Sequence, residues 1–334
     1  MLWIGGEGGI ESSLVPRAGI PFAAIPAAGV HGVGWRAVPG NAARLVRGVA
    51  AAGKHVRRFR PDVMLLTGGY VGVPTAVAGW RTPKVVYVPD IEPGLALRFL
   101  ARFARTVAVT TEDSRRYHPR TANVIVTGYP TRPALQPMDR DQARRELGLD
   151  PSSPVVLIYG GSLGARSINE AVWARLRELL LVAQVVHLTG ELDWPRVAAA
   201  RKSVPEALAA RYHAYPYLHD EMARAFSSAD LVVSRAGAST LGELPLFGLP
   251  AILIPYPHAW RYQRVNADYL VERGAAVTLD DSRLEADLIP AVRALLEDPE
   301  GLAAMTTAAR RQAVPDAARR IAAEIERIAG GPRG

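Results

Sequence analysis

Short apolar runs alternate with longer helical stretches along this chain, and this alternation limits its fold more than any other feature. It is regular from residue 154 onward and less regular before residue 137. Such alternation predicts βα units, in which helices cover both faces of a mostly parallel sheet. The sequence therefore predicts an α/β protein with two Rossmann-like domains. The expected strands are "MLWIGG", "PFAAIP", "DVMLLTGG", "KVVYVPD", "TVAVTT", "ANVIVTG", "PVVLIYG", "AQVVHLTG", "LVVSRAG", "PAILIPYP" and "AAVTL".

The length of 334 residues also suggests two domains of roughly 150 residues each. The stretch "YPTRPALQPMDRDQARRELGLDPSSP" is rich in proline and charge, so we interpret it as the interdomain connection, with the boundary near Pro137. We expect an N-terminal domain over 1–136 and a C-terminal domain over 137–314. Residues 315–334 carry alanine and isoleucine at helical spacing, which predicts an amphipathic helix that crosses between the domains, followed by a short tail.

Composition excludes some functions and leaves others open. The chain has no cysteine, so disulfides, thiolate metal sites and cysteine nucleophiles are excluded. Its net charge is +8, which fits nucleic acid, an anionic membrane surface or acidic small substrates, although a GC-rich genome could also produce the many arginines. We find no nucleic-acid-binding signature, so we expect no nucleic-acid partner. No apolar run approaches the ~20 residues that span a bilayer, so we expect no export and no spanning helix.

Two glycine turns follow predicted strands in the second half of the chain. In "YGGSLGARSINEAV", Gly161 lets the backbone approach a ligand, and Ser162 offers a hydroxyl before a helix N-terminus that favours phosphate. In "LVVSRAGASTLGEL", Ser239 and Thr240 are candidate caps of a second helix. Two adjacent helix N-termini can hold a diphosphate. The alternative interpretation is a pair of ordinary tight βα turns.

Three polar side chains follow these turns. Glu243 is one helical turn past the second glycine turn, where a carboxylate can accept bonds from both ribose hydroxyls; alternatively it is a capping or surface glutamate. Gln263 and Asn266 share a helix face and suit sugar hydroxyls, unless they are simple helix surface. Neither turn has the Walker lysine or the full G-x-G-x-x-G pattern, which disfavours an ATPase or a dehydrogenase.

Six motifs resemble those of one family and occur in the expected order. They are "GIESSLVPRAGIPFAAIP", "LLTGGYVGVPTAVAG", "VTGYPTRPAL", "GGSLGARSIN", "SRAGASTLGEL" and "LPAILIPYPHAWRYQRVNADYL". The family is MurG, the family 28 UDP-N-acetylglucosamine transferases of peptidoglycan synthesis, and the resemblance covers nearly the whole chain. It implies a GT-B fold, with UDP-N-acetylglucosamine (UDP-GlcNAc) held mainly by the C-terminal domain. It also implies a lipid-linked muramyl-pentapeptide acceptor approached from the N-terminal domain, and a role in cell-wall biogenesis, cell shape and division.

The resemblance also assigns roles to residues. Arg132 would help to bind the donor near the interdomain cleft, Glu243 would bind the ribose, and Gln263 the donor sugar. Leu218 would meet uracil through its backbone, and Tyr70 matches a position on the acceptor side. The diphosphate would be held by Ser162 and by the backbone of Ala238, Ser239 and Thr240.

The chain departs from the family pattern at three places. The family's opening strand and glycine-rich loop, whose histidine is a candidate for acceptor activation, should precede "LWIGGEGGIESSLVP", so we hypothesise a start roughly 30 residues upstream. Asp90 in "YVPD" replaces an expected asparagine, and Tyr262 replaces a glutamine before Gln263. Asp90 is our candidate base for an inverting transfer, although it could merely cap the next turn. No metal cofactor is expected, because Arg132 and two helix N-termini supply positive charge and no D-x-D motif is present.

A lipid-linked acceptor requires contact with a membrane. Phe99, Leu100 and Phe103 stand among Arg98, Arg102 and Arg105, a pattern that suits peripheral docking on the anionic cytoplasmic face of the cell membrane. An ordinary amphipathic helix packed on the sheet is the alternative. Three other functions remain open: a UDP-sugar transferase with a different lipid acceptor, a UDP-GlcNAc 2-epimerase, and a non-catalytic nucleotide-sugar-binding protein.

Overall fold

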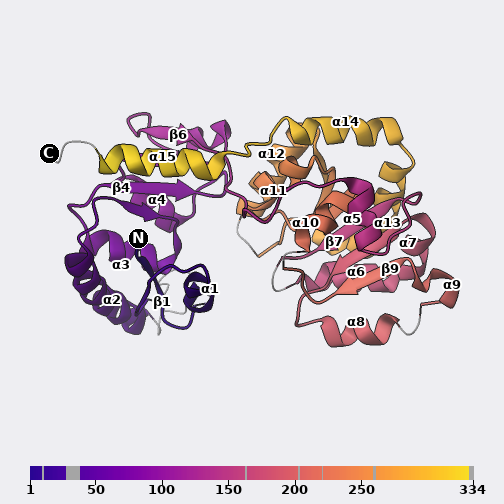
Figure 1. The fold of residues 1–334 in the computed structure, drawn as a ribbon, viewed down its shortest axis with the longest axis horizontal. Helices are drawn as coiled ribbons and strands as arrows, with labels where there is room; N and C mark the ends of the chain where they lie inside the picture. The colour runs from indigo at the N-terminus through magenta and orange to yellow at the C-terminus, as the bar shows by residue number, and fades with distance from the viewer. Residues whose placement is uncertain are drawn as a thin grey trace. The chain divides into compact units, whose positions relative to one another are not determined.

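The computed structural model divides the chain into two compact units, which are described separately (Figure 1). It describes residues 1–9, 11–27, 38–161, 164–201, 204–219, 221–258 and 261–330. Unit 1 consists of Met1–Thr127 together with Ala318–Gly334, and unit 2 consists of Gly128–Ala317. Unit 2 is therefore inserted into the sequence of unit 1. No helix of the described ranges combines the length and the apolar character that crossing a membrane requires.

Unit 1 contains parallel strands in two sheets. β1 pairs with β2, and the second sheet has the order β3-β4-β5-β6. Among the described residues, β1 pairs only with β2 and β3 pairs only with β4. The strands are β1 (Trp3–Gly6), β2 (Phe22–Ile25), β3 (Met64–Leu66), β4 (Lys84–Val88), β5 (Thr106–Val109) and β6 (Val124–Val126). The helices are α1 (Glu11–Arg17), α2 (Val38–Phe59), α3 (Gly69–Ala78), α4 (Leu95–Ala101), the 3₁₀ helix η2 (Glu112–Tyr117) and α15 (Ala317–Ala329).

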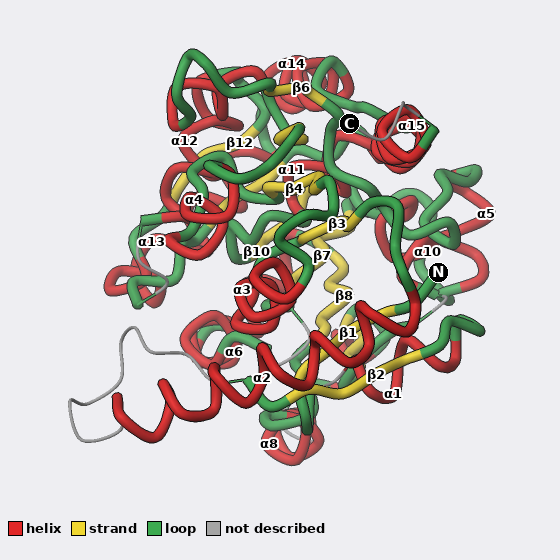
Figure 2. The backbone as a smooth tube through the Cα atoms, turned by 90° about the vertical axis from the view of Figure 1, so that its left-hand side faces the viewer, coloured by secondary structure: helices red, strands yellow, loops and turns green. Residues whose placement is uncertain are grey.

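The helices of unit 1 pack their apolar faces against one another and against its sheets. α2 and α3 lie side by side (Figure 2). Leu100 of α4 is buried with Leu66, Val86 and Val107, so the prediction that it is part of an exposed apolar patch is wrong. Its side chain faces the sheet because it lies on the same helix face as Leu97, which is also buried, whereas Phe99 points outward.

The C-terminal helix α15 completes the core of unit 1 (Figure 1). Its Ile321 and Ile328 pack against Val85 and Tyr87 of β4 and against Ala108 of β5. The Glu324 carboxylate accepts a hydrogen bond from the Thr106 hydroxyl and is paired with Arg327. The predicted amphipathic helix is thus present, with its apolar stripe on the sheet.

The change from unit 1 to unit 2 falls at Thr127 and Gly128, before the boundary expected near Pro137. Gly128 has a positive φ of 87°, and a Cβ there would lie 2.6 Å from Val314, close to the end of unit 2. The two points where the chain passes between the units are therefore packed together. The proline-rich stretch itself belongs to unit 2, where Arg144 is paired with Asp230 and the Met138 N–H donates to the Ser227 hydroxyl.

Unit 2 is built on one six-stranded parallel sheet of order β12-β11-β10-β7-β8-β9. The chain runs from β7 outward through β8 and β9, then returns to the other side of β7 for β10, β11 and β12. The strands are β7 (Val155–Tyr159), β8 (Gln184–Leu188), β9 (Tyr212–Tyr215), β10 (Leu231–Ser234), β11 (Ala251–Leu253) and β12 (Ala276–Thr278). The helices are α5 (Arg140–Glu146), α6 (Arg166–Ala174), α7 (Leu176–Val182), α8 (Trp194–Ala200), α9 (Glu206–Ala209), α10 (Met222–Ser228), α11 (Thr240–Phe247), α12 (Tyr262–Glu272), α13 (Leu284–Leu296), α14 (Pro299–Arg310) and the 3₁₀ helix η4 (Asp281–Arg283).

Each apolar run quoted above contains one strand of the structure, so the α/β prediction is confirmed. The strands β7, β8 and β10 are buried along their whole length, as expected for parallel strands covered on both faces. β9 is not among the strands predicted above. Its residues "YHAY" include a histidine, and two of the four side chains are only half-buried, so no continuous apolar run marks this edge strand.

Candidate functional site

The centre of the unit 2 sheet is a topological switch point. β7 and β10 are neighbours there, and Tyr159 pairs with Ser234, so the two strands end at the same level. The predicted glycine turns follow these two residues directly and therefore lie side by side. In open α/β sheets, ligands bind in the crevice outside the carboxyl ends of the strands at such a point.

The turn after β7 depends on its glycines. A Cβ on Gly160 would lie 2.3 Å from the Ala165 backbone. Gly164 has a φ of 79°, and a Cβ there would lie 2.2 Å from the Thr189 carbonyl oxygen. Gly161 has a φ of 87° and is exposed, and a Cβ there would have no atom of the described residues within 4 Å. Ser162, the predicted phosphate contact, lies outside the described residues. α6 begins after this turn, and its N-cap residue, Ala165, makes no side-chain capping hydrogen bond.

The turn after β10 leads into α11. The N–H and the hydroxyl of Thr240 both donate to the Gly237 carbonyl, at 3.0 and 2.7 Å, so Thr240 closes the turn. The N–H groups of Ala238 and Ser239 have no acceptor in the described part of the chain. These two half-buried residues therefore offer free amide donors beside the first turn.

Glu243 lies half-buried on the first turn of α11. Burial raises the pKa of its carboxyl group, while a hydrogen bond from Ser239 and the charge of Arg132 act in the opposite direction. Arg132 is exposed and comes near Glu243 because Tyr129 packs on Gly242 of the same helix: a Cβ on Gly242 would lie 2.8 Å from the Tyr129 side chain. The structure thus brings the "TGYPTRP" and "ASTLGEL" motifs together.

The two amides of α12 are placed differently. Gln263 is half-buried, and its Oε1 accepts a 2.8 Å hydrogen bond from the Tyr256 N–H. Asn266 is fully buried, and its Nδ2 donates to the Ala236 carbonyl at 3.1 Å. Asn266 therefore fixes the backbone that enters the second turn instead of facing solvent.

The remaining predicted residues lie in three separate segments. Leu218 follows β9, and its side chain is buried. Asp90 belongs to unit 1, where it is half-buried just after β4. Tyr70 also belongs to unit 1; it is 59% exposed on the first turn of α3, after Gly68 and Gly69, which both have positive φ.

Arg235 is a residue whose place in the site the sequence analysis did not anticipate. It follows β10 and is 9% exposed. Its Nη1 donates to the Ile254 carbonyl at 3.2 Å and to Asp281, and its Nη2 donates to the Ser167 hydroxyl at 2.6 Å. The guanidinium also lies over the Tyr256 ring, 5.2 Å from the centroid. One side chain therefore ties together the loops at the ends of β10, β11 and β12 and the start of α6.

A second buried polar network joins α6 to β8 and to the loop that follows β8. His187 is fully buried, and burial lowers its pKa to about 3, so it is neutral. Asn169 Nδ2 donates to the Thr189 carbonyl and to Asp193, which leaves its Oδ1 for His187 Nε2 at 3.0 Å. His187 Nε2 therefore carries the proton, and Nδ1 accepts from the Tyr212 hydroxyl. His187 therefore packs within β8 as a neutral core residue.

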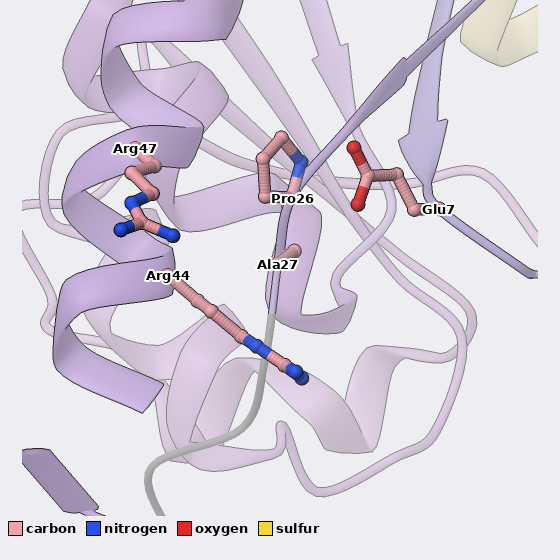
Figure 3. A pocket seen from close by; sticks show the side chains of 5 residues that line it. All are labelled: Glu7, Pro26, Ala27, Arg44 and Arg47. Carbon is pink, nitrogen blue, oxygen red and sulfur yellow. The ribbon is translucent and has the colours of Figure 1, made fainter. Parts of the chain in front are cut away.

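Unit 1 contains a cavity of about 470 Å³ lined by Glu7, Pro26, Ala27, Arg44 and Arg47. Arg44 and Arg47 project from α2 toward the Pro26–Ala27 segment, and Glu7 lies on the other side of that segment (Figure 3). Two guanidinium groups in one cavity suit an anionic ligand. Within the described ranges, no cluster of three or more His, Cys, Asp or Glu could hold a metal ion.

Solved structures share this architecture. The crystal structure of Acinetobacter baumannii MurG matches with a TM-score of 0.75 and 26% identity, over 97% of this chain and 90% of that one. A UDP-GlcNAc 2-epimerase from Neisseria meningitidis, bound to UDP-GlcNAc, matches with a TM-score of 0.65 and 14% identity, over 98% and 91% of the two chains, which shows a common fold alone. The architecture is therefore the GT-B fold, which the MurG glycosyltransferase of A. baumannii shares.

Sequence comparison gives the family. The description "Glycosyltransferase family 28 N-terminal domain" matches residues 1–109, and "Glycosyltransferase family 28 C-terminal domain" matches residues 155–321. The chain belongs to glycosyltransferase family 28. Two relatives are called UDP-N-acetylglucosamine--N-acetylmuramyl-(pentapeptide) pyrophosphoryl-undecaprenol N-acetylglucosamine transferase. The one from Roseiflexus sp. is 42% identical over 98% of this chain and 83% of its own, and the one from Desulforudis audaxviator is 41% identical over 99% and 90%.

Proposed function

We propose that this protein transfers N-acetylglucosamine from UDP-GlcNAc to undecaprenyl-pyrophosphoryl-N-acetylmuramyl-pentapeptide, a step of peptidoglycan synthesis that serves cell shape and division. The observation that carries the proposal is the pair of adjacent turns at the switch point of unit 2, whose free amides suit a diphosphate. The names of relatives with 42% and 41% identity over nearly the whole chain supply the sugar and the acceptor.

The donor is held by groups of unit 2 in this proposal. The amides of Ala238 and Ser239, together with Gly161 of the first turn, bind the diphosphate, and Thr240 keeps the second turn closed. Glu243 accepts hydrogen bonds from the ribose hydroxyls. The backbone at Leu218 meets the uracil, as the family resemblance implies.

Transfer with inversion requires a base and a stabilised leaving group. The base removes the proton of the acceptor hydroxyl while that oxygen forms a bond to C1 of the sugar and the bond from C1 to the UDP oxygen breaks. We assign the base to Asp90 and place Tyr70 on the acceptor side. Negative charge develops on the departing diphosphate, where Arg132 and the amides of both turns stabilise it, so we propose that no metal ion is required.

In this proposal, unit 1 binds the acceptor and docks on the membrane. The diphosphate and carboxylates of a lipid-linked muramyl-pentapeptide match the two arginines of the α2 cavity. Leu95, Phe99 and Phe103 of the α4 region are 52%, 45% and 62% exposed, and Arg98, Arg102 and Arg105 around them are exposed as well. Apolar side chains within a basic surround suit peripheral docking on the anionic cytoplasmic face of the cell membrane.

The test is turnover of UDP-GlcNAc with a soluble analogue of the muramyl-pentapeptide lipid, using this chain and a form extended upstream. We expect UDP and a β-linked disaccharide, detected by mass spectrometry. Formation of UDP-N-acetylmannosamine without acceptor would instead support a 2-epimerase. A product formed only with another lipid would change the acceptor, and binding without any product would support a non-catalytic protein.

A further inference from the structure

The orientation of the Gln263 amide is fixed by its surroundings. The Tyr256 N–H lies 2.8 Å from Oε1, and because an N–H group only donates, the oxygen of the amide must face it. Gln263 Nε2 has no acceptor in the part of the chain that the structure describes. Gln263 therefore presents a hydrogen-bond donor to any ligand, which would be met by a hydroxyl or carbonyl oxygen of the donor sugar.

This orientation depends on where Tyr256 is held. Tyr256 is 44% exposed in the loop after β11, and its ring lies under the guanidinium of Arg235. Arg235 also binds the carbonyl of Ile254, two residues before Tyr256. Arg235 thus contacts both the Tyr256 ring and the backbone at Ile254. These two contacts fix the Tyr256 N–H group that holds Gln263.

Arg235 is itself anchored on two further elements. Asp281 of η4 accepts from Nη1, and Ser167 on the first turn of α6 accepts from Nη2 and donates to Asp281 at 2.8 Å. Both terminal nitrogens are occupied by protein acceptors and the residue is buried, so Arg235 is not placed to touch a ligand. Its planar fork can serve Ile254, Asp281 and Ser167 together, which the single ammonium of a lysine cannot do in the same geometry.

We propose that Arg235 is a positioning residue for donor-sugar selectivity: through Tyr256 it holds Gln263 so that Nε2 faces the sugar. The proposal rests on the proposed function, since it requires a UDP-sugar in this site. The proposal separates nucleotide binding from selectivity for the sugar. The nucleotide is bound by the turns and Glu243, whereas selectivity among sugars depends on Arg235 acting through Gln263.

The experiment is a double-mutant cycle of Arg235→Lys and Gln263→Ala, with the affinities of UDP, UDP-GlcNAc and its C4 epimer UDP-N-acetylgalactosamine measured by calorimetry. We expect Arg235→Lys to weaken UDP-GlcNAc binding roughly tenfold, the effect of losing one well-placed hydrogen bond, and to reduce the preference over the epimer. UDP affinity should change less than about twofold. If Arg235 acts through Gln263, the double variant should resemble Gln263→Ala alone.

Two further variants keep the test specific. Gln263→Glu preserves the bond from the Tyr256 N–H but replaces the donor by an acceptor, so it should lose selectivity while Tyr256 stays in place. Arg264→Lys, exposed on α12 and paired with Asp268, is the matched control and should leave all three affinities unchanged. Additive effects of Arg235→Lys and Gln263→Ala, or an equal loss of UDP affinity, would overturn the inference. Absence of UDP-GlcNAc binding by the unaltered protein would instead overturn the proposed function.

Discussion

At the scale of single residues, Glu243 shows how one carboxyl group is tuned. Burial raises its pKa, and the Ser239 hydroxyl and Arg132 partly offset that shift. A carboxyl whose pKa is raised on folding binds more protons in the folded state, so stability falls as pH rises through the folded pKa. At pH values above that folded pKa, the ionised Glu243 therefore costs stability, which is consistent with a role in binding.

This balance predicts a pH-dependent donor affinity. The ribose hydroxyls need an ionised carboxylate to accept both hydrogen bonds, so affinity for UDP should fall as the pH falls toward the raised pKa of Glu243, above the usual glutamate range near 4.5. Glu243→Gln should weaken UDP binding roughly tenfold at pH 7 and flatten the profile. Calorimetric titrations from pH 5 to 8 would measure this, and a variant that keeps the wild-type profile would contradict it.

Single residues also mark the limit of sequence reasoning. The spacing of Gln263 and Asn266 places them near one helix face but does not tell how deep each lies; packing against Ala236 buries Asn266 and leaves Gln263 half-exposed. Arg235 escaped notice because arginines are usually exposed, and only the acceptors from three distant segments explain its burial. Those acceptors come together through tertiary packing.

At the scale of elements, the chain was more predictable. Apolar runs bounded by glycine gave the buried strands, and the strand, glycine turn and helix order placed both turns of unit 2. The order of strands in the sheet could not be predicted, because the apolar runs do not indicate that β10 pairs with β7. The adjacency of the two turns was therefore an expectation that the sheet order confirmed.

The contact between α11 and the Tyr129–Arg132 segment gives one prediction at this scale. Gly242→Ala would place a Cβ 2.8 Å from the Tyr129 side chain and 3.0 Å from its carbonyl oxygen, so the segment must shift. Because Arg132 would move with it, we expect the KM for UDP-GlcNAc to rise roughly tenfold. Gly40→Ala in α2, where a Cβ would have no atom of the described residues within 4 Å, is the control. Unchanged kinetics in Gly242→Ala would show that Arg132 does not depend on this contact.

The exposed phenylalanines of the α4 region give a second prediction at the scale of elements. Phe99 and Phe103 stack edge to face at 5.2 Å, and inserting either into a bilayer removes a large apolar surface from water. Phe99→Ser and Phe103→Ser should each reduce partitioning onto vesicles that contain phosphatidylglycerol by roughly tenfold, while turnover of a soluble acceptor is retained. Leu192→Ser, at a 70% exposed position of unit 2, is the comparison. Equal losses in all three variants would argue against a docking surface on α4.

At the scale of the whole molecule, unit 1 depends on a helix that follows unit 2 in the sequence. Ile321 and Ile328 of α15 are buried against β4 and β5, so Ile321→Ala or Ile328→Ala should destabilise unit 1 by about 2–5 kcal/mol. Unit 2 should keep its UDP affinity. Chemical denaturation combined with UDP titration would separate the two effects, and Glu326→Ala, on the exposed face of α15, should be nearly neutral.

The insertion of unit 2 within unit 1 also sets an order of events during synthesis. Residues 1–127 leave the ribosome before unit 2, yet their helix α15 follows only after the 190 residues of Gly128–Ala317, roughly 10–40 s later at ordinary elongation rates. For that interval the apolar side chains of β4 and β5 that α15 covers have no partner helix. Unit 1 thus begins to emerge before unit 2 but is completed after it, and the nascent protein must be kept from aggregating until α15 has been synthesised.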